Sequence, residues 1–510
     1  MNKFDRRAFL KTTGLALATT LPVLSACARP KIISDPFTLG IASGSPLPDG
    51  VVLWTRLAPQ PLAGGGLDPL PISVGWEVAS DEAFRKIVQR GTAIAQPDFG
   101  HSIHVEVDGL EPAHWYWYRF FVGDAVSPIG RTRTALAPKT AGEFRFAFAS
   151  CQQYEQGYYA AHRHLAQEEL DLVIFLGDYI YESSWGKNHV RNHGTPQPRT
   201  LEQYRNRYAL YKSDPDLQRS HARFPWIVTW DDHEVANDYA NDHSQELDPQ
   251  FLARRTAGYQ AFYEHMPLRA SARPNGPNLR LYEQYDFGRL LRIYMLDDRQ
   301  YRDYQVCPKP NRGGSNLVGA ECKARLNEKL TLLGWEQETW LERGLESSRA
   351  QWDVIAQQTL MAQTLRAEKK FWTDGWDGYP TARRRLLENV SKRSSTNTLV
   401  VSGDVHANAV CDLKVDFDDP RSPVVATEFC GTSMTSQGPS AKNIAEWRAN
   451  NPHIRYARGD KRGYVRVVLN ERRAQVALRV IGSEKDPKSG ISSLAQFVVE
   501  NGRPGAKSES

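Results

Sequence analysis

The chain has 510 residues, of which 41% are hydrophobic and 24% charged, a balance typical of a folded globular protein and not of a disordered one. Its length predicts more than one domain. A mean hydropathy of −0.53, with no long apolar run after the N-terminus, excludes a polytopic membrane protein. The net charge is +5, but residues 1–26 hold four basic groups and one acidic group, so the remainder carries +2. So small an excess indicates no specific nucleic-acid partner.

The first 28 residues predict a twin-arginine signal peptide with a lipobox. Arg6-Arg7 precedes a short, weakly apolar stretch over residues 14–26, which is too short to span a bilayer but suits a signal peptide. The stretch ends in Leu24-Ser25-Ala26-Cys27, so we favour lipidation of Cys27 over simple cleavage after Ala28. The expected partners are therefore the twin-arginine export machinery and, through the lipid, a membrane. The expected location is the periplasm or the cell surface.

Export permits disulfides among the five cysteines that follow the signal peptide. Cys307 and Cys322 bracket a Pro- and Gly-rich loop, and a bridge between them is the plain interpretation. Cys411 and Cys430 follow successive apolar runs, and either a disulfide or two buried thiols is compatible with that pattern. Cys151 is then the odd cysteine and requires another explanation.

Two folded regions follow the signal peptide. Residues 37–136 contain short alternating strands between Gly and Pro residues, which predicts a β-sandwich. Residues 143–483 alternate apolar strand-like runs with helical stretches, which predicts an α/β layered domain. Residues 484–510 are rich in Ser, Gly and Lys, and we expect a mobile tail. No sequence feature indicates an oligomeric state.

Five apolar runs of the second region each stop at polar groups. The runs are followed by Ser150-Cys151-Gln152, Gly177-Asp178-Tyr179-Ile180-Tyr181-Glu182, Asp231-Asp232-His233-Glu234, Asp297-Asp298-Arg299 and Ser402-Gly403-Asp404-Val405-His406. Because the carboxyl ends of parallel strands lie along one edge of a sheet, these groups should converge there. Each alone has an ordinary explanation as a helix cap, a buried thiol or an ion pair. Together, a thiol, a phenol, imidazoles, carboxylates and a guanidinium predict a metal site beside an anion-binding arginine.

These motifs resemble the PhoD-type alkaline phosphatase/phosphodiesterase family, and Gly177-Asp178-x-x-Tyr181 is similar to the metal-binding element of purple acid phosphatases. Gly44-Ser45-Pro46 and the stretch from Asp49 to Arg56 are similar to the N-terminal module of the family. The resemblance implies a four-layered αββα metallophosphoesterase sandwich behind a small β-sandwich. It also implies Fe(3+) and Ca(2+) as cofactors and export by the twin-arginine route.

Carried over residue by residue, the resemblance places Cys151, Asp178, Tyr181, Asp404 and His406 near iron, and Asp232 and Asn237 near calcium. The residue chemistry agrees, because thiolate, phenolate and carboxylates suit a trivalent ion better than zinc or magnesium. Oxygen ligands in turn suit calcium.

In catalysis, Arg299 is expected to brace the phosphate oxygens and His233 to protonate or orient the leaving group. The sequence thus predicts an exported, metal-dependent phosphoric ester hydrolase that acts on phosphate mono- or diesters. A phospholipase D-like phosphodiesterase is the alternative enzyme. A non-catalytic, calcium-binding surface lipoprotein is the alternative outside enzymes.

Overall fold

The computed structural model describes residues 34–393 and 397–509. The predicted signal peptide and Cys27 lie outside the described residues. Within the described ranges, none of the helices is long and apolar enough to cross a membrane.

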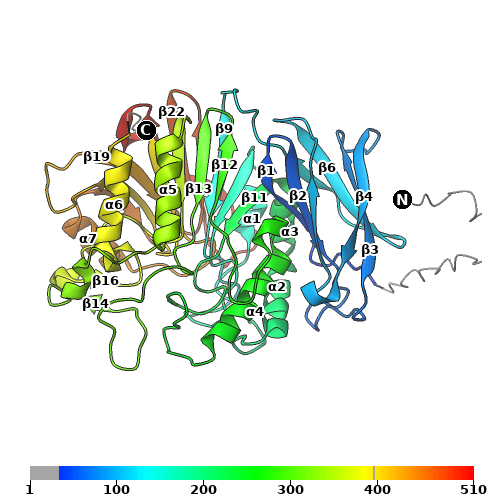
Figure 1. Ribbon diagram of the computed structural model, residues 1–510, viewed down its shortest axis with the longest axis horizontal. Helices are drawn as coiled ribbons and strands as arrows, with labels where there is room; N and C mark the ends of the chain where they lie inside the picture. The colour runs from blue at the N-terminus through cyan, green and yellow to red at the C-terminus, as the bar shows by residue number, and fades with distance from the viewer. Residues whose placement is uncertain (1–33, 394–396, 510) are drawn as a thin grey trace, which may run out of the picture.

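A ten-stranded sheet forms one inner layer of the molecule (Figure 1). Its strands are β1 Ile41–Leu47, β2 Gly50–Arg56, β5 Ser102–Val107, β9 Phe144–Ala149, β10 Leu172–Leu176, β11 Pro225–Thr229, β21 Gly463–Leu469, β22 Arg473–Ile481, β23 Ile491–Glu500 and β24 Arg503–Glu509. Their order is β24-β23-β22-β21-β9-β10-β11-β1-β2-β5. The four central strands β9, β10, β11 and β1 run parallel to one another.

A seven-stranded sheet forms the second inner layer. It contains β12 Glu283–Phe287, β13 Leu291–Met295, β15 Trp352–Ala356, β17 Thr398–Ser402, β18 Asn408–Lys414, β19 Val424–Cys430 and β20 Ile454–Arg458. The order is β12-β13-β15-β17-β19-β18-β20, with β13, β15, β17 and β19 parallel. Apolar side chains fill the space between the sheets, among them Phe148 and Ile174 of the first and Ile293 and Val401 of the second.

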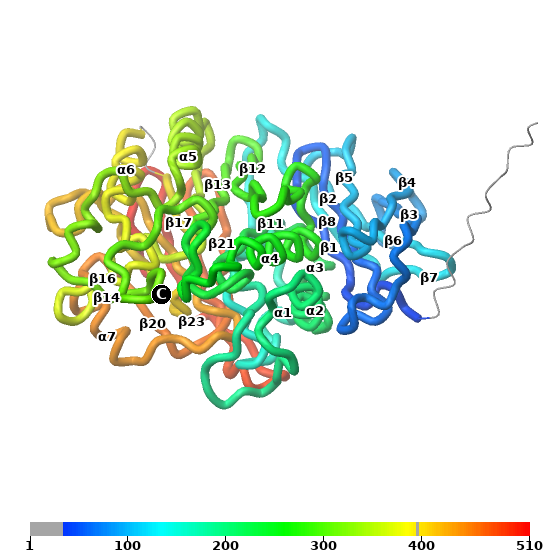
Figure 2. Tube along the Cα trace, turned by 60° about the horizontal axis from the view of Figure 1, so that its bottom comes forward, coloured from blue at the N-terminus to red at the C-terminus, as the bar shows by residue number. Residues whose placement is uncertain are grey.

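Helices cover the outer faces of the two sheets. They are α1 Ala160–Leu165, α2 Leu201–Lys212, α3 Pro215–Arg223 and α4 Phe251–His265 on the first sheet, and α5 Trp335–Ser347, α6 Pro380–Ser391 and α7 Ala441–Asn450 on the second. In both views α5 and α6 lie side by side (Figure 1 and Figure 2). A capping box between Thr200 and Gln203 starts α2, and Asp214 caps α3 ahead of Pro215. The predicted αββα sandwich is confirmed.

The N-terminal region is a β-sandwich that shares a sheet with the larger domain. One half consists of β3 Ile72–Ala79, β4 Ile87–Ala95, β6 Trp115–Val122, β7 Ala125–Val126 and β8 Gly130–Arg133. The other half is β1, β2 and β5, which continue the ten-stranded sheet because β1 pairs in parallel with β11. The two halves enclose their own apolar core. The sequence predicted a separate module and did not show this continuity.

The prediction of a mobile tail over residues 484–510 is wrong for its larger part. Residues 491–500 and 503–509 form β23 and β24 and extend the first sheet beyond β22. In β23, only Phe497, Val498 and Val499 are buried, so the sequence of this strand lacks the continuous apolar run that is typical of a core strand. The hairpin of β21 and β22 lies inside the sheet, between β9 and β23.

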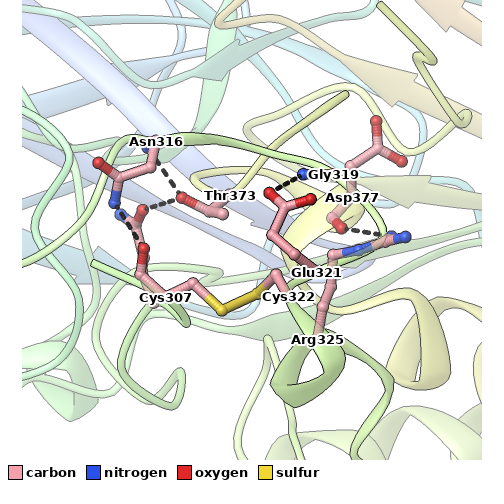
Figure 3. Close-up of a disulfide and its surroundings, with 9 residues drawn as sticks. Cys307, Asn316, Gly319, Glu321, Cys322, Arg325, Thr373 and Asp377 are labelled. Atoms are coloured by element: carbon pink, nitrogen blue, oxygen red, sulfur yellow. Dashed lines mark hydrogen bonds between the residues drawn. A yellow bond between two sulfur atoms is a disulfide. The ribbon is translucent and has the colours of Figure 1, made fainter. Parts of the chain in front are cut away.

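The cysteines divide into one bridge and three thiols in the described part of the chain. Cys307 and Cys322 form the predicted disulfide (Figure 3). Cys411 and Cys430 are free and buried, which decides between the two alternatives for that pair. The disulfide closes a loop that contains β14 Leu317–Val318, which pairs with β16 Phe371–Trp372.

Candidate metal centre

The five predicted strand ends do meet, but they come from two sheets. Cys151, Asp178 and Asp232 follow β9, β10 and β11 of the first sheet, whereas Arg299 and Asp404 follow β13 and β17 of the second. The expectation of a single sheet edge is therefore corrected. The two sheets face each other, so the carboxyl ends of their parallel strands border a common site.

Four of the predicted ligand residues have left-handed backbone conformations. The φ angles are 59° at Cys151, 57° at Asp178, 62° at Asp404 and 54° at His406. Residues other than glycine seldom adopt such angles, and they concentrate at functional sites where the surrounding structure enforces them. Gly177 has a φ of 98°, and a Cβ there would lie 2.5 Å from the backbone nitrogen of Asp231, so only glycine allows these two loops to approach.

Cys151, Asp178 and His406 form the first group of candidate metal ligands. One donor atom from each lies within 4.8 Å of the other two. Tyr181 joins this group, because its hydroxyl donates to Oδ2 of Asp178 at 2.7 Å and lies 3.1 Å from Nε2 of His406. The structure thus brings together four of the five residues expected near iron.

The fifth, Asp404, approaches from the second sheet. Its Oδ2 accepts a hydrogen bond from Oγ1 of Thr359 at 2.6 Å, and its Oδ1 lies 3.8 Å from Nη2 of Arg299. Burial raises the pKa of Asp404 to about 6, against the opposing effect of Arg299.

Burial also governs the thiol and the phenol of the first group. It raises the pKa values of Cys151 and Tyr181 well above their ordinary values, and the charge of Asp178 adds to the effect in both. A cation is therefore required to hold these groups as thiolate and phenolate.

Asp178 belongs also to a second group, with Asp232 and His233, whose donor atoms again lie within 4.8 Å of one another. Nδ1 of His233 lies 2.6 Å from Oε2 of Glu182. Burial alone would lower the pKa of His233, but Glu182, Asp232 and Asp178 outweigh it and raise the pKa well above its ordinary value. These carboxylates thus favour the protonated form of His233, which is the form that a proton donor requires.

The structure places Asn237 beside this group through its backbone. Its N–H donates to Oε1 of Glu182 at 3.0 Å, and its side-chain amide donates to Oε1 of Gln245 at 3.3 Å. Coordination of calcium by the Asn237 side chain remains a prediction.

Arg299 is fully buried and surrounded by carboxylates. Nε pairs with Asp231, and Nη1 pairs with Asp374 at 2.8 Å. Nη2 lies 3.8 Å from both Asp232 and Asp404 and has no hydrogen-bond partner among the described residues. The guanidinium thus offsets the charges of Asp231 and Asp374 next to the candidate ligands. Its predicted contact with phosphate depends on Nη2, the nitrogen without a partner.

The acidic groups exceed the basic groups that face them, which is the property expected of a cation site. Oδ1 of Asp178, Oδ2 of Asp231 and Oδ1 of Asp298 are buried without a hydrogen-bond partner in the described part of the chain. Buried carboxylate oxygens are normally paired or bound to a metal, and leaving them bare is costly. The residues present therefore fit hard cations.

Glu234 is a positioning residue to which the sequence motif alone assigned no role. Its carboxylate accepts the backbone N–H groups of Asp178 at 3.1 Å, Tyr179 at 2.5 Å and Asp231 at 2.8 Å. One side chain thus ties together the loops after β10 and β11. The signal was its position directly after the Asp-Asp-His motif.

A sixth loop, residues 431–436 after β19, was missed altogether. Oγ of Ser436 lies 2.8 Å from Oη of Tyr181 and 2.9 Å from the carbonyl oxygen of Cys151. Nη1 of Arg462 donates to the carbonyl oxygens of Ser436 at 2.8 Å and His406 at 3.0 Å. These residues hold the ligand-bearing loops in register. Small hydroxyl residues after an apolar run were the only sequence signal.

Comparison with known proteins agrees with this geometry. The family model "PhoD-like phosphatase" matches residues 146–478, and "PhoD-like phosphatase, N-terminal domain" matches residues 24–136. Alkaline phosphatase D of Bacillus subtilis (strain 168) is 45% identical over 99% of this chain and 89% of its own length. A solved structure of PhoD matches with a TM-score of 0.88 and 46% identity, covering 94% of this chain and 93% of that one.

A purple acid phosphatase from yellow lupin (Lupinus luteus) matches with a TM-score of 0.54 at 11% identity, over 90% of this chain and 74% of its own, which indicates a shared fold. The two family models together cover most of the chain, and the bacterial relative aligns along nearly all of it. The chain therefore belongs to the PhoD-like phosphatase family.

Proposed function

We propose that this phosphoric ester hydrolase cleaves phosphate mono- or diesters outside the cytoplasm with the help of a ferric ion and calcium. The observation that carries the proposal is the buried donor set of Cys151, Asp178 and His406, within 4.8 Å of one another. Tyr181 and Asp404 would complete a set rich in anionic ligands, which suits Fe(3+). Asp232 and Asn237 would offer oxygens to Ca(2+), and Asp178 stands in both groups.

The side chains of the site divide the work of hydrolysis. When bound, the cations would polarise the phosphoryl group and lower the pKa of an attacking water. His233, held cationic against Glu182, donates its proton to the leaving alkoxide. Arg299 offers Nη2 to a phosphate oxygen between Asp232 and Asp404, and its rigid guanidinium fixes the direction of that contact.

The direct test measures metal content and turnover together. Purified wild-type protein should contain iron by elemental analysis and release product from an aryl phosphate or a bis-aryl phosphodiester with calcium present. Cys151→Ala should lose iron, whereas Cys411→Ala, which removes a buried free thiol elsewhere, should retain it. Full iron content in Cys151→Ala would show that the Cys151 thiolate is not an iron ligand. Failure to hydrolyse both esters would favour the non-catalytic alternative.

Calcium has its own test. Chelation should abolish turnover reversibly, because Asp232 and its neighbours would then repel the phosphate. Unchanged rates in excess chelator would contradict the calcium role.

Export and anchoring are proposed from the N-terminal segment alone. Arg6-Arg7 would address the folded, metal-loaded protein to the twin-arginine machinery, and Cys27 would carry a lipid that holds it at the membrane. Cys27→Ala should move the protein from the membrane fraction to the soluble fraction. Unchanged fractionation would contradict a lipid at that cysteine.

A further inference from the structure

A separate pocket lies beside the second ligand group, on the side of His233. Its volume is about 270 Å³, and its walls include Glu182, Asn237 and Arg254. Glu182 is the partner of His233, so the pocket and the site share one wall. Most other lining residues are neutral and polar, namely Ser183, Gln197, Ser244 and Gln245.

Arg254, from α4, is the one cation that lines this pocket. It is 4% exposed, and Nε donates to Oη of Tyr204 at 2.9 Å. Nη2 is buried without a hydrogen-bond partner in residues 34–393 and 397–509, where the guanidinium also makes no ion pair. A buried guanidinium N–H group without an acceptor is costly, so the retention of Nη2 in a pocket wall points to an anionic ligand that accepts from it.

The nearby carboxylates Glu182 and Asp248 interact electrostatically with Arg254, but each is bonded directly to another group. Oε2 of Glu182 faces His233 at 2.6 Å and Oε1 accepts the N–H of Asn237 at 3.0 Å. Asp248, close to the start of α4, pairs with Arg199 at 2.5 Å. Glu246 lies at the exposed rim of the pocket.

We infer that this pocket is a subsite for an oxyanion, phosphate or carboxylate, carried by the alcohol part of the ester, with Arg254 as its anchor. The inference rests on the proposed function, in which the leaving alcohol lies beside His233, and Nδ1 of His233 is 2.6 Å from Glu182 in the wall of this pocket. A guanidinium binds either oxyanion through paired N–H groups, and the neutral polar walls add hydrogen bonds. The subsite selects esters whose leaving alcohol carries a second negative charge.

Three esters with matched chains test the subsite: 3-hydroxypropyl phosphate, propane-1,3-diyl bisphosphate and 4-(phosphonooxy)butanoate. The first has a neutral leaving alcohol, and the other two carry a phosphate or a carboxylate on it. In the wild type, kcat/KM for phosphate release should be about tenfold or more higher for a charged ester, after correction for the two equivalent bonds of the bisphosphate. The two charged arms show which oxyanion is preferred.

Variants assign the preference to Arg254. Arg254→Gln should remove it, and Arg254→Lys should retain part of it, because lysine keeps the charge without the planar pair of donors. Arg199→Gln is the matched control and should keep the wild-type preference, since that guanidinium is bonded to Asp248. Melting temperatures identify any variant that fails to fold, and Arg254→Lys remains informative if Arg254→Gln does not fold.

The outcomes separate the subsite from the proposed function. No turnover of any ester by the wild type contradicts the proposed function, and titration calorimetry with the same compounds then still compares charged with neutral ligands. Tighter binding of a charged compound that is lost in Arg254→Gln supports the subsite. Equal binding and equal kcat/KM for charged and neutral compounds, or a preference that persists in Arg254→Gln, overturns it.

Discussion

Removal of the Cys307–Cys322 disulfide should lower the stability of the whole domain. The bridge joins residues 15 positions apart, and the segment between them contains little secondary structure beyond the two residues of β14. In the chain-entropy model, closure of a loop of this length contributes about 3 kcal/mol by restricting the unfolded chain. The double variant Cys307→Ser/Cys322→Ser should therefore lose about 3 kcal/mol.

The effect should also reach the acidic groups under the metal centre. The N–H of Ser315 donates to Oε1 of Gln305 at 2.6 Å, and Nε2 of Gln305 donates to Oδ1 of Asp374 at 2.7 Å. The N–H of Asn316 donates to Oγ1 of Thr373 at 3.0 Å (Figure 3). The closed loop thus braces the carboxylate that pairs with Arg299.

Thermal unfolding measures the loss. If a chain of 510 residues unfolds as one unit, its unfolding entropy is about 1 kcal/mol/K, so the melting temperature should fall by about 3 °C. A reducing agent should bring the wild type to the same value and leave the double variant unchanged. An equally stable double variant would refute the reasoning, as would a variant that still responds to the reductant.

Three further changes test local arguments. Glu234→Gln places an amide against backbone N–H groups whose hydrogen bonds the carboxylate accepts. Iron content and kcat should therefore both fall about tenfold or more, and full metal loading would contradict this. Ser436→Ala removes the hydrogen bond to the hydroxyl of Tyr181, so kcat/KM should fall about tenfold with little change in melting temperature. An unchanged kcat/KM would show that Ser436 does not position Tyr181. Burial lowers the pKa of His104 to about 4, so the unfolded chain takes up a proton that the folded protein excludes as the pH falls below 6.5. Stability should drop by about 2 kcal/mol more between pH 7 and pH 5 in the wild type than in His104→Gln, and identical pH profiles would refute this.

The apolar runs were sufficient to locate the parallel strands and the loops that follow them, for a physical reason. Buried parallel strands read as continuous apolar runs, so the run at residues 144–149 coincides with β9 and that at 172–176 with β10, and the residues after them mark the site. The division of these strands between two sheets could not be read, because apolar runs do not specify their neighbours. β24 was missed because an edge strand needs no apolar face, and only the ladder to β23 identifies it.

Within the site, the convergence of Cys151, Asp178 and His406 could be predicted, whereas the residues that support them could not. Cys151 and Asp178 stand out because their side chains are unusual at strand ends. Ser436 and Arg462 act through backbone carbonyl groups and a phenol far away in the chain, and such contacts leave no pattern in residue type. The same holds for Arg254, whose significance lies in the partner that it lacks.

The buried carboxylates of the metal centre lower the stability of the folded protein, and bound cations should restore it. Burial and neighbouring carboxylates raise the pKa of Asp231 well above its ordinary value, and burial raises that of Asp298 to about 7, against the opposing charge of Arg299 in both. Such raised values mean that the folded protein binds protons more tightly than the unfolded chain, so this contribution to stability is lost as the pH rises toward 7. A cation replaces those protons, and its affinity must therefore increase with pH. Added calcium should consequently raise the melting temperature of metal-stripped protein more at pH 8 than at pH 6. The same increase at both values would mean that the carboxylates are already ionised at pH 6, which contradicts their raised pKa values.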